Sequence, residues 1–183
     1  DDFFFFLGNT DPKKNTKGTL EAFSGFLKQT KSDYKLVMLD YDRIELEKIL
    51  VEIGDKQLIN EIVLTGYVNN TDLPAIYSQC SIFLYPSLRE SFGIPMLEAM
   101  ACGVPVITSN TSSMPEVAGN AAHIVNPFDS EEIIIGMIKI LSEKDYSEDL
   151  CKKGINRSQL FSWKNMAEQV LEIYNKVNKQ HRD

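Results

Sequence analysis

The sequence predicts an α/β fold: a doubly wound, parallel sheet of Rossmann-like type, followed by C-terminal helices. Three observations favour it. Short apolar runs alternate with longer segments of helical periodicity. The runs lack the polar alternation of half-exposed strands and therefore suit strands that are buried on both faces. The 183 residues, of which 43% are hydrophobic and 25% charged, suffice for a single globular domain with its own core.

We predict six strands, in chain order, at residues 3–7, 35–39, 62–64, 82–85, 104–108 and 123–125. Helices fill the intervals, at residues 16–29, about 44–53, 72–79 and 95–102. The first helix places Leu20, Phe23 and Leu27 on one stripe that can pack against the sheet. A sheet of this kind binds ligands at the carboxyl ends of its strands.

The segment after the sixth strand is predicted to be helical. Asp129 and Glu132 have the spacing of a capping box, which opens a helix through Leu141. Ser162 is expected to cap the last helix. The apolar stripe of that helix must cover either this sheet or an absent neighbouring domain, and it consists of Trp163, Met166, Val170, Tyr174 and Val177.

Composition excludes several function classes. The formal charge of -7 and the pI near 4.9 argue against a general affinity for nucleic acid or for anionic membranes. Three widely spaced cysteines, Cys80, Cys102 and Cys151, predict reduced thiols in a cytoplasmic protein. The opening DDFFFFLG is too short for a signal peptide or a membrane span and has no initiating Met. We therefore expect a fragment of a longer protein.

Two carboxylates point to a ligand. Glu98 lies in a helix whose neighbouring residues are almost all apolar, where an unpaired buried charge costs several kcal/mol. Glu90 stands in the loop before that helix, which we expect to begin with Pro95 at N1 and to end before Gly103. Free N–H groups around Phe92, Gly93 and Ile94 would attract an anion.

These features together predict a nucleotide sugar as the ligand, with Glu98 accepting hydrogen bonds from ribose hydroxyls and Glu90 from a second sugar. The competing interpretation is structural. In that interpretation, the charge of Glu98 near the helix N-terminus stabilises the helix by ~0.3 to 1 kcal/mol, and Glu90 is exposed to solvent.

The loop from Gly8 to Asn15 brings Lys13 and Lys14 to the same edge of the predicted sheet. Two ammonium groups there suit a diphosphate and can stabilise the charge that develops on it when a glycosidic bond breaks. A solvated turn is the alternative.

The run from Tyr85 to Pro127, YPSLRESFGIPMLEAMACGVPVITSNTSSMPEVAGNAAHIVNP, resembles the signature of glycosyltransferase family 4, which contains retaining enzymes of the GT-B fold. The similarity extends from Phe3 to Tyr174. It implies a C-terminal, donor-binding half whose E-x7-E pair is Glu90 and Glu98. In such enzymes the second Glu binds ribose and the first lies against the donor sugar. The backbone between them, here Ser91, Phe92, Gly93 and Ile94, touches the sugar and the diphosphate.

The family commonly has Gly-Arg followed by Lys in the basic loop, whereas this chain has Gly8 and Asn9 there. It is more similar to members with a P-R-K-N pattern, often mannosyltransferases. The resemblance therefore implies a phosphate-binding, catalytic role for Lys14 beside Glu90 and a supporting role for Lys13. It leaves the role of Asn9 open. The Lys13-Lys14-Asn15 pattern suggests GDP-mannose as the donor, and a UDP-hexose is the alternative. Tyr67 and Val68 resemble the loop that packs against the base.

The resemblance implies that residues 1–183 are one donor-binding domain of a hexosyltransferase that needs no metal. The acceptor would bind mainly to an N-terminal domain absent from this chain, so the chain alone is expected to be inactive. Family members often attach peripherally to the inner face of the membrane through that other half. The alternative is a non-catalytic nucleotide-binding or interaction module of the same fold.

Two other patterns compete with this interpretation. Asp40 and Asp42 form a D-x-D triplet like the metal-binding motif of GT-A enzymes, but with 12 Asp in 183 residues about one such triplet arises by chance. GT-B relatives often have Gly where this chain has Asp40. An NAD-binding domain is disfavoured because the first loop lacks G-x-G-x-x-G. His123 is expected in the core or at a sheet edge, without a catalytic role.

Overall fold

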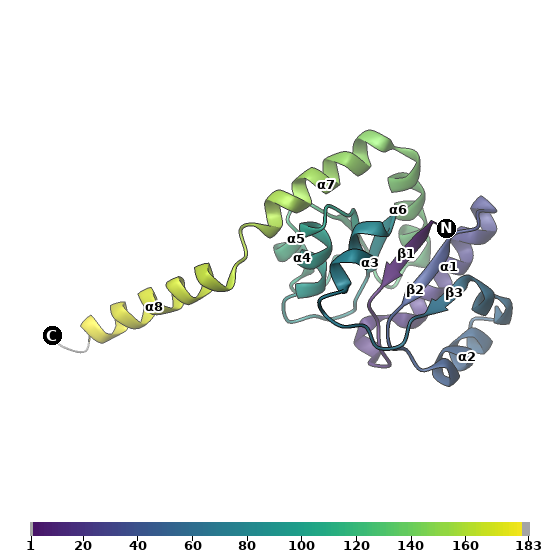
Figure 1. The fold of residues 1–183 in the computed structure, drawn as a ribbon, viewed down its shortest axis with the longest axis horizontal. Coiled ribbons are helices and arrows are strands. Elements are labelled where there is room, and N and C mark those ends of the chain that lie inside the picture. Colours follow the sequence, from purple (N-terminus) through teal and green to yellow (C-terminus); the bar gives the residue numbers. More distant parts are fainter. Residues whose placement is uncertain (1, 181–183) are drawn as a thin grey trace.

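The computed structural model describes residues 2–180, and it confirms the predicted fold class. One parallel sheet lies between two layers of helices (Figure 1). Its strand order is β3-β2-β1-β4-β5-β6, so the first strand of the chain is central. The strands are β1 (Phe3–Phe6), β2 (Lys35–Met38), β3 (Ile62–Leu64), β4 (Ile82–Tyr85), β5 (Val106–Ser109) and β6 (His123–Val125).

The helices divide between the two faces of the sheet. One core cluster contains side chains of α1 (Thr16–Thr30), α2 (Arg43–Glu52) and α6 (Ser130–Ser142). The other contains side chains of α3 (Leu73–Gln79), α4 (Ile94–Ala101) and α5 (Met114–Ala118). The remaining elements are α7 (Lys144–Ser158), α8 (Trp163–Gln180) and two 3-10 helices, η1 (Pro12–Lys14) and η2 (Lys56–Glu61).

The central strand β1 is apolar throughout because both of its faces are covered. Phe4 packs against Phe26 of α1 with ring centroids 5.1 Å apart. Phe5 points to the other face, where it contacts Tyr77 of α3, also at 5.1 Å. The sequence therefore shows no polar alternation in this strand.

Several predicted boundaries are wrong by one or two residues. The fifth strand begins at Val106, because Pro105 has no N–H for the ladder and the Val104 amide still bonds to Ala99 at the end of α4. Helix α4 begins at Ile94, one residue earlier than predicted. Gly93 is its N-cap, which makes Pro95 the second helical residue.

The end of α4 is confirmed, since Gly103 follows the C-cap with a φ of +74°. Ser162 caps α8 as predicted, accepting a 3.0 Å bond from the Asn165 amide. The capping box of α6 is only half formed. Asp129 accepts from the amide of Glu132, but the Glu132 carboxylate accepts from the Asn126 amide.

Two helices of the described region were not predicted separately. α5 has only five residues. α7 is mostly polar and buries only Leu150 and Gly154, the latter against Met100 of α4, so it shows no apolar stripe.

The three thiols are free, as predicted, and burial raises the pKa of Cys80 to about 12.

Helix α8 leads away from the body of the molecule (Figure 1). Its side chains are exposed from Trp163 to residue 178, so its apolar stripe does not cover this sheet. Of the two predicted coverings, the first is therefore wrong for the described residues. Between residues 2 and 180, no helix combines the length and the hydrophobicity that crossing a bilayer requires.

Candidate functional site

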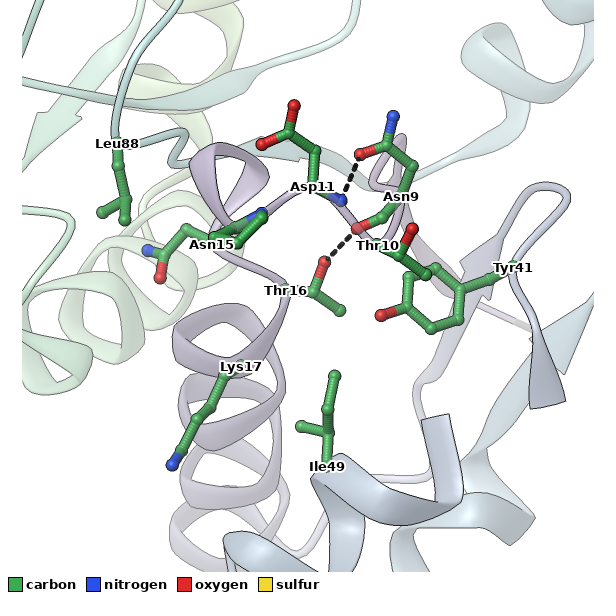
Figure 2. A pocket seen from close by; sticks show the side chains of 10 residues that line it. Asn9, Thr10, Asp11, Asn15, Thr16, Lys17, Tyr41, Ile49 and Leu88 are labelled. Atoms are coloured by element: carbon green, nitrogen blue, oxygen red, sulfur yellow. Dashed lines mark hydrogen bonds between the residues drawn. The ribbon is translucent and has the colours of Figure 1, made fainter. Parts of the chain in front are cut away.

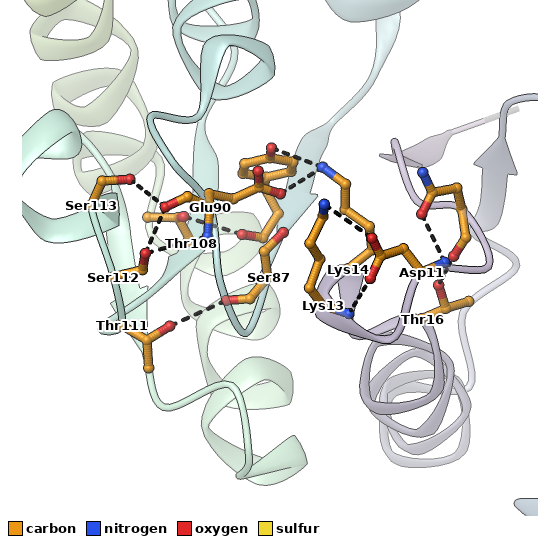
Figure 3. A network of polar contacts seen from close by, with 12 residues as sticks. Asp11, Lys13, Lys14, Thr16, Ser87, Glu90, Thr108, Thr111, Ser112 and Ser113 are labelled. Carbon is orange, nitrogen blue, oxygen red and sulfur yellow. Dashed lines mark hydrogen bonds and ion pairs between the residues drawn. The ribbon is translucent and has the colours of Figure 1, made fainter.

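Two loops meet at the carboxyl edge of the sheet because β1 and β4 are parallel neighbours. The β1–α1 loop contains η1, and the β4–α4 loop runs past it (Figure 3). The Leu88 amide donates a 2.7 Å bond to the Lys13 carbonyl. The Asn15 side chain donates to the carbonyls of Pro86 and Pro127, at 3.0 and 2.8 Å. The loops that carry the predicted site are thus tied to each other.

Lys14 and Glu90 form an ion pair at this junction. Lys14 Nζ lies 2.5 Å from Glu90 Oε1, and the side chains are only 16% and 12% exposed. Lys14 Nζ also donates to Tyr85 Oη at 3.3 Å. Burial, with the nearby charge of Glu90, raises the pKa of the Tyr85 phenol. The structure therefore brings together the two residues that were predicted to be catalytic.

Serine hydroxyls of the β5–α5 loop hold the backbone of Glu90. The Glu90 carbonyl accepts bonds from Ser112 Oγ at 2.6 Å and Ser113 Oγ at 3.0 Å (Figure 3). Sequence reasoning did not assign these serines to the site. The signal that could have found them is a hydroxyl-rich run directly after a strand, at the same sheet edge.

Lys13 is paired with Asp11 through a 3.0 Å contact between Nζ and Oδ2. Hydrogen bonds from the Lys13 backbone and side chain lower the pKa of Asp11 below its ordinary value. Lys13 also lines a pocket of about 290 Å³ together with Arg89, Glu90 and Ser91. This pocket gathers two further predicted residues and adds Arg89, a cation that the sequence reasoning overlooked.

Asn9 lines a second pocket, of about 300 Å³, with Asp11, Thr16 and Tyr41 among its other walls (Figure 2). Its side-chain oxygen accepts the Asp11 amide at 3.0 Å. Gly8 is buried, and a Cβ there would lie 2.1 Å from the Phe6 ring. Both residues thus have structural reasons for their identity, and their predicted contact with a ligand stays a prediction.

The burial predicted for Glu98 is wrong. Helix α4 buries Met96, Ala99 and Met100, whereas Glu98 lies on its exposed side. Tyr77 Oη of α3 donates a 3.1 Å bond to Glu98 Oε2. The apolar residues next to Glu98 in sequence lie on other faces of the helix, so they do not indicate whether the carboxylate is buried.

The loop between Glu90 and α4 presents backbone amides at the edge of the sheet. Gly93 has a φ of +97°, and a Cβ there would lie 2.6 Å from Met114 Cε, so glycine is required. The Ile94 amide lies at the positive end of α4, Pro95 has no N–H, and the Met96 amide donates to the Gly93 carbonyl at 3.1 Å. Ser91 is exposed, as are Phe92 and Ile94, at 41% and 46%.

The predicted base loop follows β3. Tyr67 is 76% exposed, while Val68 packs partly against the core cluster around α3 and α4. Gly66 accepts the Asp40 amide at 3.1 Å, and Asp40 itself has a φ of +43°. This left-handed conformation favours glycine, and Asp is one of the few other residues that tolerate it. Asp42 caps α2 by accepting the Glu45 amide at 2.9 Å, so each Asp of the D-x-D triplet has a structural role.

Comparison with known proteins identifies related sequences. Residues 1–157 match a family model described as "Glycosyl transferases group 1". The O-antigen chain mannosyltransferase B of Escherichia coli is 35% identical over 174 residues, which are 94% of this chain and 45% of that protein. The MMP alpha-(1->4)-mannosyltransferase of Mycolicibacterium hassiacum is 32% identical over 136 residues, covering 72% and 32%. The chain thus spans less than half the length of these curated relatives.

Solved structures of similar fold include a sucrose-phosphate synthase and a protein in complex with UDP-glucose. A sucrose-phosphate synthase from Thermosynechococcus elongatus superposes with a TM-score of 0.81 at 23% identity, covering 98% of this chain and 46% of that one. An Anabaena protein in complex with UDP-glucose superposes with the same TM-score of 0.81 at 18% identity, covering 96% and 49%.

Proposed function

Because the chain belongs to the group 1 glycosyl transferases, we propose that it is the donor-binding domain of an enzyme that transfers a sugar from a nucleoside diphosphate to an acceptor. The observation that carries this proposal is the meeting of Lys14, Glu90 and the amide-bearing loop 91–94 at one sheet edge. The acceptor would bind mainly to a second, N-terminal domain of the longer protein, and the chain alone would transfer no sugar.

The ribose would lie against Glu98. Tyr77 occupies one oxygen of this carboxylate and fixes its orientation. A carboxylate offers about four lone-pair positions, so it can also accept from a vicinal diol. Val68 and Tyr67, after β3, would contact the base.

The diphosphate would lie near Lys14, Lys13 and the start of α4. Cations and N–H groups placed there stabilise the negative charge that grows on the departing phosphate. Glu90 then positions the donor sugar and Lys14. In a retaining reaction of this kind, the departing phosphate can take the acceptor's proton, so no separate base is needed.

The donor we propose is GDP-mannose. The Lys13-Lys14-Asn15 pattern and the two mannosyltransferase relatives favour it, whereas the UDP-glucose complex of the Anabaena neighbour makes a UDP-sugar the obvious comparison. We also propose that donor binding is independent of metal.

Calorimetric titration of the chain tests the proposal and gives the first prediction. GDP-mannose or GDP should bind, with UDP and UDP-glucose as comparators, and EDTA should change nothing. Glu98→Ala should weaken binding by ~1 to 3 kcal/mol, because ribose hydroxyls lose a charged acceptor.

Glu148→Ala, on the exposed side of α7, is the matched control and should bind like the wild type. The absence of heat with every nucleotide at millimolar concentration would contradict donor binding and favour a non-catalytic module. Binding abolished by EDTA would instead favour a metal site.

A further inference from the structure

The link between α7 and α8 touches the proposed donor loop through two aromatic rings. Phe161 of the link and Phe92 of the loop pack edge to face, with centroids 5.6 Å apart and planes at 81°. Such pairs stabilise a contact beyond the burial of the two rings. The contact joins segments that are far apart in the chain.

The residues before and after Phe161 in the sequence both fix its position. Its amide donates a 3.1 Å bond to the Ser158 carbonyl at the end of α7. The next residue, Ser162, caps α8. The ring itself is half-buried against the core cluster that contains α4 and α5. Phe161 is therefore a fixed point rather than part of a loose tether.

Arg157 reinforces this arrangement. Its guanidinium lies over the Phe161 ring, 4.9 Å from the centroid. The same guanidinium donates to the carbonyls of Val117 and Glu116 at the end of α5, at 2.9 and 2.6 Å. Phe161 thus packs between an anchored cation and the donor loop.

The donor loop has less support of its own. Residues 91–93 belong to no helix or strand, and Phe92 is 41% exposed. Gly93, next to it, is left-handed and closely approached by Met114 of α5. A shift of the Phe92 ring would therefore rotate the adjacent amides at the start of α4.

We propose that Phe161 is a positioning residue that holds Phe92 and so orients the amides of residues 92–94 toward the sugar diphosphate. The inference rests on the proposed function for its ligand. Glu98 and Val68, which would bind ribose and base, lie outside this loop. Loss of Phe161 should therefore weaken binding of the sugar diphosphate selectively and leave binding of the nucleoside part unchanged.

The first measurement needs no ligand. Backbone ¹⁵N order parameters are compared for the wild type, Phe161→Ala, Phe161→Tyr and Leu160→Ala, the last being an exposed neighbour. Order parameters of residues 91–94 should fall only in Phe161→Ala, while those of α4 stay unchanged, and the ring of Phe161→Tyr should restore them. Unchanged order parameters in Phe161→Ala would overturn the inference.

The second measurement compares affinities for GDP-mannose and GMP. Phe161→Ala should weaken the binding of GDP-mannose about tenfold and the binding of GMP less than twofold. Phe161→Tyr and Leu160→Ala should bind both ligands like the wild type. An equal loss for both ligands would indicate general disruption and contradict a positioning role. If the wild type binds neither ligand, the proposed function fails, and the order parameters alone decide whether Phe161 braces the loop.

Discussion

At the scale of single residues, the pairing of Lys14 with Glu90 has the largest consequence. Each predicted partner of the donor is already bound to the other across a 2.5 Å contact, so the local charge is balanced before any ligand arrives. A diphosphate must therefore compete with the carboxylate or displace it. The acidic protein holds an anion site whose positive charge is partly masked.

Glu90→Gln should consequently tighten GDP binding by about 5- to 30-fold, the equivalent of a partly exposed ion pair worth ~1 to 2 kcal/mol. The same substitution should lower sugar transfer by the full-length enzyme, because the sugar loses its contact. Calorimetry at low and high salt measures the first effect, which should shrink as salt rises. Glu52→Gln, which frees the exposed Lys17, is the control. Weaker binding by Glu90→Gln would mean that the carboxylate helps to hold the diphosphate.

Site residues could be predicted where a sequence motif contains them. Their exposure and their contacts could not, because these depend on residues that are distant in sequence. The positions of Glu90 and Glu98 followed from the E-x7-E spacing, but the exposure of Glu98 did not. Lys14 and Glu90 are too far apart in sequence for periodicity to show their contact. The left-handed φ of Asp40 was also invisible, because Asp is only one of several residues that tolerate it.

At the scale of elements, β6 is fastened to α6 and α7 through His123. Its Nδ1 lies 2.8 Å from Tyr146 Oη of α7, and its ring fills the space left by Gly136 of α6. Burial lowers the pKa of His123. The charge of Lys139 lowers it further, whereas Glu132 raises it. The folded state therefore favours the neutral ring.

This depressed pKa predicts a loss of stability in weak acid. Above the unfolded pKa of about 6.5 the ring is neutral in both states, and the contribution is complete. As pH falls below that value the unfolded chain binds the proton first, so the free energy of unfolding decreases until the folded pKa is passed. The sequence contains one other histidine, His181, which is replaced by Gln so that only His123 titrates as a histidine. In this His181→Gln variant, urea unfolding should show a decrease in the free energy of unfolding between pH 7.5 and 5. The decrease should be smaller when His123→Gln is added. Parallel pH curves would show that His123 contributes nothing.

The strands were predictable at this scale because every buried strand is a short apolar run between turn residues. The helices were less so. The two helices without a broad apolar stripe, α5 and α7, were not predicted separately. Helix α5 has only five residues, and α7 buries only a Leu and a Gly. The boundary errors arose where helix caps and Pro105 overrode the apolar pattern.

At the scale of the whole molecule, α8 adds little to the stability of the described body. Its side chains up to residue 178 are exposed, and an 18-residue helix without packing is marginal in water. A chain that ends after Ser162 should therefore have a free energy of unfolding within about 0.5 kcal/mol of the full chain. Thermal and urea unfolding measure it. As a control, Leu150→Ala should cost about 2 to 5 kcal/mol. A large loss on truncation would show that α8 packs on the body in solution.

The central place of β1 determines when the sheet can be completed during synthesis. Among the strands of this sheet Phe3–Phe6 are synthesised first, yet β1 pairs with β2 and with β4, which begins at Ile82. Phe4 can be covered early by Phe26 of α1, but Phe5 packs on Tyr77 and Phe83 and therefore stays uncovered until α3 and β4 have been synthesised. Parallel pairings of this range form slowly and leave nascent chains open to aggregation. Cells that produce this chain quickly would therefore depend on chaperones for its yield.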